Sequence, residues 1–165
     1  MRGMVESRGD APPLLVTAGD LVIVRRDRPR SAVFACPDAC SEILTVNLDP
    51  RSGPAWSLYE GRLGITLFPS VWRESGCRSH FILWRSGIYW CNGDEEWADL
   101  EAQDDALAAR VLAALSLTEV RSFVEVAHAL GEIPWDVLGA CRGLVRSGQA
   151  IGLRDRGGER FRRAR

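Results

Sequence analysis

Four of the five cysteines lie in three short clusters, together with one histidine, and their types and spacing are those of a metal site. The clusters are Cys36-Pro-Asp-Ala-Cys40, Cys77-Arg-Ser-His80 and Trp90-Cys91. Each lies at the end of a strand-like run, where a turn can direct side chains toward one point. Zinc binds thiolate and imidazole, and a structural zinc takes four such ligands in a tetrahedron. The chain therefore offers one donor more than the site requires.

The four cysteines form the better set of zinc ligands. Cys36 and Cys40 make one pair at the exit of a strand. Cys77 precedes one arm of a hairpin and Cys91 ends the other arm, so these two can make the second pair. An iron–sulfur cluster on the same ligands and buried free thiols are the alternatives. We expect a structural zinc.

Strand alternation leaves His80 free for other chemistry. If the strand starts at Cys77, then Ser79 faces the same side as Cys77, and His80 faces the other side. A tight turn over residues 77–80 would instead make His80 a ligand. A free imidazole can act as the base that a weak serine nucleophile needs.

The candidate nucleophiles are Ser70, which follows Pro69 at a strand end, and Ser79, which an extended strand would point away from His80. Glu42 and Asn47 are candidates to orient the imidazole, because each lies near the strand beside the first cysteine pair. Either serine can instead be a turn or cap hydroxyl without a catalytic role.

The elements that must position these residues predict an α+β fold. Residues 19–91 contain short apolar or alternating runs without intervening helices, which predicts antiparallel sheets. The expected strands are 21–24, 32–35, 43–48, 56–59, 65–68, 79–84 and 88–91. We divide the chain into a disordered tail (1–18), a small zinc-binding antiparallel β domain (19–93) and a helical module with a basic tail (94–165).

The second half predicts a winged-helix-like module. A first helix is expected at 94–115, with Trp97 and Leu100 in its inward stripe, and a second opens at the capping box Ser116-Leu-Thr-Glu119. A third helix runs from Pro134 to Gly148, and a hairpin follows. Its first turn contains Trp135-Asp136, where a DNA-binding helix presents basic or amide side chains. We therefore expect contacts with proteins rather than with nucleic acids.

Composition is that of a globular protein, with 46% hydrophobic residues and a net charge of −1 over 165 residues. No apolar run approaches the roughly 20 residues that a membrane helix requires. The start is short and polar and does not predict a signal peptide. We expect a cytoplasmic protein without membrane partners, in which cysteines more often bind metals than form disulfides.

Several short motifs of the first half occur in an order that resembles one protein family. They are Cys36-Pro-x-x-Cys40-x-Glu42, Leu44-x-x-Asn47-Leu48, Pro54-x-Trp56-x-Leu58, Thr66-Leu67-x-Pro69-Ser70-x-Trp72, Gly76-Cys77-Arg78-Ser79-His80-Phe81 and Trp90-Cys91. Over residues 20–92 the chain resembles the BubE family, which is encoded beside bacterial ubiquitin-like proteins and E1-like and E2-like enzymes. Family members often carry an extra cysteine and glycine where this chain has Asp38 and Ala39.

The resemblance implies a deubiquitinase-like peptidase that acts on the C-terminus of a ubiquitin-like protein in an antiviral defence operon. It implies serine-type chemistry, with cysteines that hold a metal. His80 would activate Ser70, or Ser79 if the local backbone is not extended, and zinc would stay out of the chemistry.

Two rival functions remain open on the sequence alone. In the first, zinc is catalytic, with three protein ligands, a bound water and Glu42 as the base. In the second, the chain is a binding module without chemistry, which recruits an E2-like protein or a nucleic acid. Chelation would abolish activity in the first case, and the purified protein would cleave nothing in the second.

Overall fold

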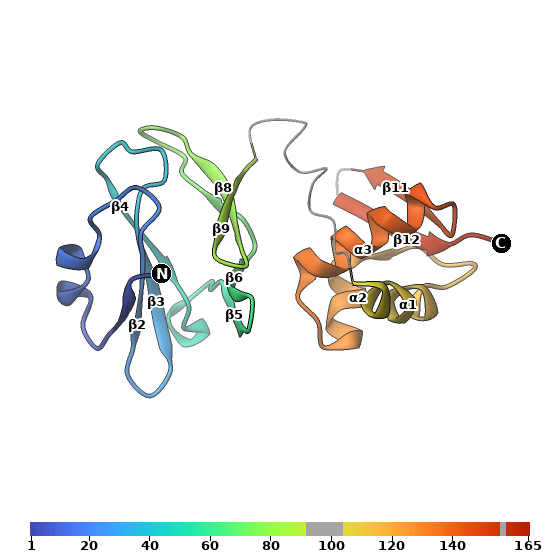
Figure 1. Cartoon of the computed structure of the whole chain (residues 1–165), viewed down its shortest axis with the longest axis horizontal. Coiled ribbons are helices and arrows are strands. Elements are labelled where there is room, and N and C mark those ends of the chain that lie inside the picture. The colour runs from blue at the N-terminus through green and yellow to red at the C-terminus, as the bar shows by residue number, and fades with distance from the viewer. Residues whose placement is uncertain (92–103, 156–157) are drawn as a thin grey trace. The chain divides into compact units, whose positions relative to one another are not determined.

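The computed structural model describes residues 1–91, 104–155 and 158–165, and the chain divides into two compact units, Met1–Asp94 and Glu95–Arg165 (Figure 1). The first unit is built from short strands in three sheets, as the runs of apolar residues predict. The second contains the α-helices and one further sheet. The fold is α+β, and its sheets are antiparallel apart from one strand pair.

The first sheet has the order β1-β2-β3-β4, a second pairs β5 with β6, and a third has the order β7-β8-β9. The strands are β1 (Gly3–Val5), β2 (Leu21–Arg25), β3 (Pro29–Ala35), β4 (Ile43–Asn47), β5 (Ser57–Gly61), β6 (Gly64–Phe68), β7 (Val71–Trp72), β8 (His80–Trp84) and β9 (Gly87–Trp90). One core of buried side chains fills the space between the sheets. It contains Phe34 of β3, Leu67 of β6, Val71 of β7 and Phe81 of β8.

The expectation of a disordered tail over residues 1–18 is wrong. This segment contains β1 and two 3-10 helices, Arg8–Asp10 and Pro12–Leu14. Its side chains cover the second face of the first sheet, where Ala11 is buried against Val22 and Val33. The strand β1 pairs in parallel with β2, whereas the strand pairs within residues 19–91 are antiparallel, as expected. The apolar residues Val5, Ala11 and Leu15 order the segment by packing on this sheet face.

The turn between β8 and β9 connects the third sheet to the second. Arg85 and Ser86 form a two-residue turn with positive φ angles of 49° and 63°. The Ser86 N–H donates to the Ile65 carbonyl at 2.8 Å, and the Ile65 N–H donates to Ser86 Oγ at 3.1 Å. These bonds fix β6 beside β8, and therefore fix where the chain leaves β6 toward Ser70.

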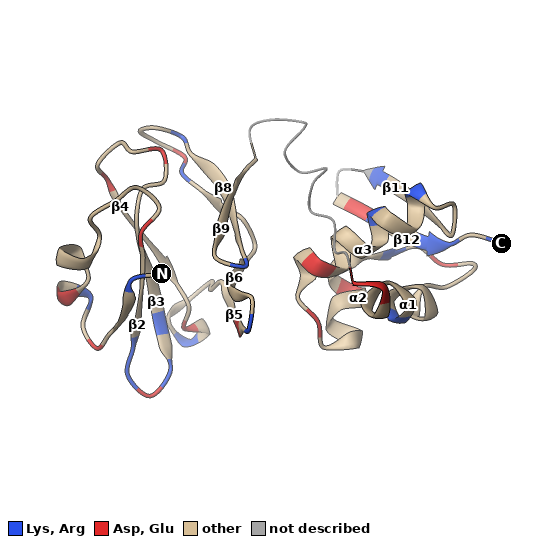
Figure 2. Cartoon of the chain, viewed as in Figure 1, with Lys and Arg blue, Asp and Glu red and all other residues tan. Residues whose placement is uncertain are grey.

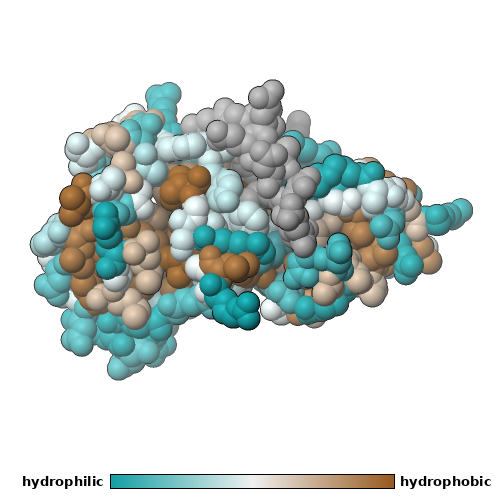
Figure 3. Space-filling view, viewed as in Figure 1, coloured by the Kyte–Doolittle hydropathy of each residue, from teal (hydrophilic) through white to brown (hydrophobic). Residues whose placement is uncertain are grey.

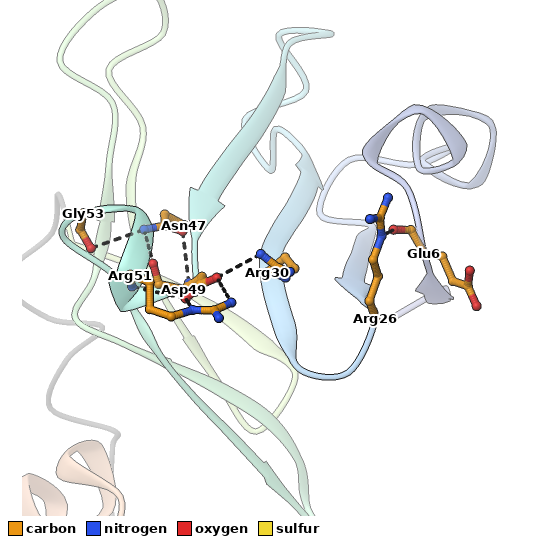
Figure 4. Close-up of polar contacts among 7 residues, drawn as sticks. All are labelled: Glu6, Arg26, Arg30, Asn47, Asp49, Arg51 and Gly53. Atoms are coloured by element: carbon orange, nitrogen blue, oxygen red, sulfur yellow. Dashed lines mark hydrogen bonds and ion pairs between the residues drawn. The ribbon is translucent and has the colours of Figure 1, made fainter.

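A buried carboxylate organises the loop after β4 (Figure 4). Asp49 is 1% exposed and receives charged hydrogen bonds from Arg51 and Arg30, with its Oδ2 2.8 Å from Arg51 Nη2 and 3.1 Å from Arg30 Nη1. Asn47 donates from Nδ2 to the carbonyls of Asp49 and Pro54, both at 3.0 Å. Asn47 is therefore a structural residue of this loop, and it does not contact His80.

The Asp49 contacts predict acid-sensitive stability. Hydrogen bonds from Arg51 hold the pKa of Asp49 well below its usual range. Its stabilising contribution is complete above the unfolded-state pKa of about 3.9 and is lost as pH falls toward the lower folded-state pKa. We expect Asp49→Asn to melt at a lower temperature than wild type at pH 7. The difference between the two melting temperatures should become smaller as the pH approaches 3. Circular dichroism melts between pH 3 and 7 measure both, and Asp27→Asn, in the exposed β2–β3 turn, is the control; an equal loss in both variants would contradict the prediction.

The second unit has the element order α1 (Asp105–Ala114), β10 (Arg121–Ser122), α2 (Phe123–Leu130), α3 (Pro134–Arg146), β11 (Ala150–Asp155) and β12 (Gly158–Arg163). Its sheet has the order β10-β12-β11 and is antiparallel. Helix α3 packs against α1, α2 and β11. The expected stripe residues Trp97 and Leu100 lie outside the described residues.

The second helix begins later than its predicted capping box. Ser122 and Glu125 form the box, and α2 starts at Phe123. Ser116 Oγ instead accepts the N–H groups of Thr118 and Glu119 within a turn. The prediction of a helix start at residue 116 is therefore wrong by about two turns.

On the face of the protein drawn in Figure 3, the hydrophobic residues do not form one large apolar surface. Arginines mark both strands of the β11–β12 hairpin (Figure 2), and hydrophobic residues reach the surface in separate groups among hydrophilic ones (Figure 3). Among the described residues, no helix is long and apolar enough to cross a membrane.

Candidate catalytic and metal-binding sites

Ser70 and His80 meet on the outer face of the third sheet. His80 Nε2 lies 2.9 Å from Ser70 Oγ, a hydrogen-bond distance. His80 is the first residue of β8 and lies opposite Trp72 of β7. Because side chains alternate along a strand, Ser70 faces the same side as Trp72, next to the imidazole. Val71 and Phe81 face the other way and are buried in the core.

Further contacts hold this pair in place. The indole Nε1 of Trp56 donates to the Ser70 carbonyl at 3.2 Å, and the Trp56 N–H donates to the Asn47 carbonyl at 2.8 Å. The Trp72 ring lies over the imidazole with 5.9 Å between ring centroids, although the Trp72 residue itself is 63% exposed. Partial burial lowers the pKa of His80 below its usual 6.5. The imidazole is therefore neutral at neutral pH and can accept a proton.

Ser79 lies on the opposite side of β8 from His80. It is 2% exposed, and its Oγ lies 3.6 Å from Cys36 Sγ. The alternation expected from the sequence thus separates the two candidate nucleophiles: Ser70 is beside the imidazole, and Ser79 is beside the cysteines.

Cys36, Cys40 and Cys77 form a compact cluster whose sulfur atoms all lie within 4.8 Å of one another. The Sγ atoms of Cys36 and Cys77 are 3.6 Å apart. Hydrogen bonding, first of all to the Ser79 hydroxyl, lowers the pKa of Cys77 to about 7, so that the metal-binding thiolate is populated at neutral pH. Three convergent thiols suit a soft metal such as zinc.

Arg73 is a member of this cluster that sequence reasoning missed. Its Nη1 donates to the sulfurs of Cys40 and Cys77 at 3.4 and 3.3 Å. The side chain of Glu42 is mostly exposed, and its carboxylate pairs with Arg73 at 3.9 Å. Glu42 therefore belongs to the rim of the cysteine cluster, and the structure does not bring it to His80.

The structure does not bring Cys91 into the cluster. The Cys91 N–H donates to the His80 carbonyl at 2.8 Å, which continues the β8–β9 register. A residue opposite His80 faces the His80 side of the ribbon, away from Ser79 and Cys36. Burial also raises the pKa of the Cys91 thiol to about 12. Cys91 faces away from the cluster, and its thiol is protonated at neutral pH. It therefore does not form the expected pair of metal ligands with Cys77.

A family model described as "Bacterial ubiquitination-like system serine protease (BubE)" matches residues 8–91. The chain belongs to the BubE family. The match confirms the resemblance and begins at residue 8, so the BubE region includes most of the N-terminal segment that covers the first sheet. It ends at Cys91, before the second unit. Neither a curated protein nor a solved structure matches this chain.

Proposed function

We propose that this BubE protein is a serine-type, deubiquitinase-like peptidase that cleaves at the C-terminus of a bacterial ubiquitin-like protein. The observation that carries the proposal is the 2.9 Å contact between His80 Nε2 and Ser70 Oγ, which are both partly buried beside the exposed Trp72. The family description supports both the serine chemistry and the ubiquitination-like setting. Ser70 is the nucleophile and His80 is the base.

The chemistry needs only these two side chains and nearby backbone groups. His80 takes the Ser70 hydroxyl proton while Oγ bonds to the scissile carbonyl carbon. The imidazolium gives that proton to the leaving amine as the C–N bond breaks, and water then hydrolyses the acyl-serine by the reverse use of His80. The Val71 N–H is used in the β7–β8 ladder and Pro69 has none, so we assign the Ser70 N–H as one oxyanion donor.

The metal in this proposal is structural. Cys36, Cys40 and Cys77 would hold a zinc ion, and Cys91 is no longer assigned to it. Such an ion would cross-link the end of the β7–β8 connection, at Cys77, to the end of β3, while the reaction occurs on the other face. The rival with catalytic zinc would use the same three cysteines and Glu42, which pairs with Arg73 at the rim of the cluster, and the chelator experiment below separates the two.

The second unit is proposed to be a winged-helix-like protein-binding module. Its order of helices and strands and its closing hairpin support this assignment. Trp135 and Asp136 in the first turn of α3 are buried, so this turn does not present side chains to DNA. We propose E1-like or E2-like proteins of the same system as partners, in the cytoplasm.

The proposal is tested with the ubiquitin-like protein of the same system carrying a C-terminal coumarin amide. We expect the purified protein to release coumarin, and a fluorophosphonate probe to modify Ser70, as identified by peptide mass spectrometry. A brief exposure to a chelator should leave the labelling unchanged. Coumarin release that stops at once with the chelator, without serine labelling, would favour catalytic zinc; no release at any enzyme concentration would favour a binding module.

The pH dependence of cleavage follows from the environment of His80. Protonation of the imidazole removes the base, so kcat/KM falls on the acid side with a midpoint at the His80 pKa. Because burial lowers that pKa, the midpoint should lie below about 6.5. Trp72→Ala exposes the ring and should move the midpoint up toward that value. A wild-type midpoint above 7 would contradict the assignment of His80 as a partly buried base.

A further inference from the structure

The outer edge of β7 has backbone groups that β8 does not use. The Arg73 N–H donates to the Ser79 carbonyl at 2.9 Å, so Arg73 and Ser79 are a hydrogen-bonded pair. Bonded and non-bonded pairs alternate in an antiparallel ladder, and the N–H and C=O of Trp72 therefore point away from β8. β7 is the terminal strand of its sheet. Within residues 1–91, 104–155 and 158–165, no hydrogen bond to these two groups of Trp72 is found.

This free edge extends in only one direction from the nucleophile. The Ser70 carbonyl, the preceding outward group, already accepts the indole N–H of Trp56. An added chain can therefore pair at Trp72, but Trp56 blocks pairing through the Ser70 carbonyl. A peptide that reaches Ser70 from the Trp72 side runs opposite to β7. Exposed strand edges bind extended peptides in this manner through main-chain hydrogen bonds.

We propose that the backbone of Trp72 binds the C-terminal tail of the ubiquitin-like substrate as an added antiparallel strand. With the first residue before the scissile bond opposite Ser70, the third residue lies opposite Trp72. The N–H and C=O of that third residue then bond to Trp72, while those of the second residue face away. The exposed indole of Trp72, on the same face as Ser70 and His80, lies beside the tail. This inference rests on the proposed peptidase function.

The first test moves a single methyl group along the substrate backbone. The coumarin-amide substrate is prepared with an N-methyl group on either the second or the third residue before the scissile bond. We expect methylation of the third residue to lower kcat/KM by about tenfold or more, because a hydrogen bond is lost and the methyl group meets the Trp72 carbonyl. Methylation of the second residue should change it by less than about threefold. Trp72→Ala, which keeps the backbone groups, should preserve this preference; equal losses for the two substrates would overturn the proposal.

The second test does not depend on cleavage. In Ser70→Ala, amide hydrogen exchange is followed at single residues before and after saturation with the intact ubiquitin-like protein. We expect exchange at Trp72 to slow by about tenfold or more on binding, whereas Arg73, already bonded to Ser79, stays slow in both states. Unchanged exchange at Trp72 with the substrate bound would overturn the added strand. If exchange at Trp72 slows but the wild type cleaves nothing, the added strand is supported and the proposed peptidase function is refuted.

Discussion

Replacing Ser70 with alanine is expected to lower kcat for release of the C-terminal group by about a thousandfold to a millionfold. The structure places the Ser70 hydroxyl beside the His80 imidazole, with Oγ 2.9 Å from Nε2. Nucleophile and base act as a unit, so Ser70→Ala and His80→Ala combined should be no slower than either single variant. Single-turnover release of coumarin, with melting curves to verify folding, measures the effect.

Ser79→Ala is the matched comparison for this experiment. Ser79 is buried beside Cys36 on the other face of the strand, so its loss should act through the metal cluster and not through the nucleophile. We expect a moderate fall in activity that follows metal content. If Ser79→Ala were inactive with full metal content while Ser70→Ala stayed active, Ser79 and not Ser70 would be the nucleophile.

Replacing Cys77 with serine is expected to abolish stoichiometric metal binding and to lower the melting temperature of the first unit by roughly 10 °C or more. In small domains, the binding energy of a structural metal is folding energy, and each kcal/mol lost shifts the melting temperature by several degrees. The site cross-links the β7–β8 connection to the end of β3 through Cys36 and Cys77. Activity should fall with the metal, because Ser70 and His80 flank the released connection.

Cys91→Ser and Cys141→Ser are the controls, since both replace partly or fully buried cysteines that lie outside the cluster. Each should retain one metal per chain by elemental analysis. Loss of metal in Cys91→Ser alone would restore the four-cysteine site expected from the sequence. If Cys77→Ser kept its metal, the cluster of Cys36, Cys40 and Cys77 would not be the metal site.

The opposite faces of Ser79 and His80 could be predicted because alternation is a local property of a strand. The side of Cys91 could not, because it depends on the register of the hairpin. The two-residue turn at Arg85 and Ser86 places Cys91 opposite His80. A slip by one residue would put it opposite Ser79 or Phe81 and turn its thiol toward the cluster. Nothing in the residues of the turn alone distinguishes these registers.

The helix start and the N-terminal segment show the same limit. The sequence contains two possible capping boxes, Ser116 to Glu119 and Ser122 to Glu125, and α2 uses the second, which directly precedes an apolar run. Residues 1–13 are mostly polar, yet the N-terminal segment pairs with β2 and covers a sheet face. Both outcomes are decided by contacts with distant parts of the chain, which local patterns do not contain.

The separation of the two sites on opposite faces of one ribbon has an evolutionary consequence. The cysteine cluster and the core hold the ribbon together from one face, whereas Ser70 and His80 lie on the other face and support neither. One substitution at Ser70 can therefore end cleavage without repacking anything. Under the proposed function, such a descendant would still hold ubiquitin-like tails at the edge of β7, and a protease would have become a reader of the same modification.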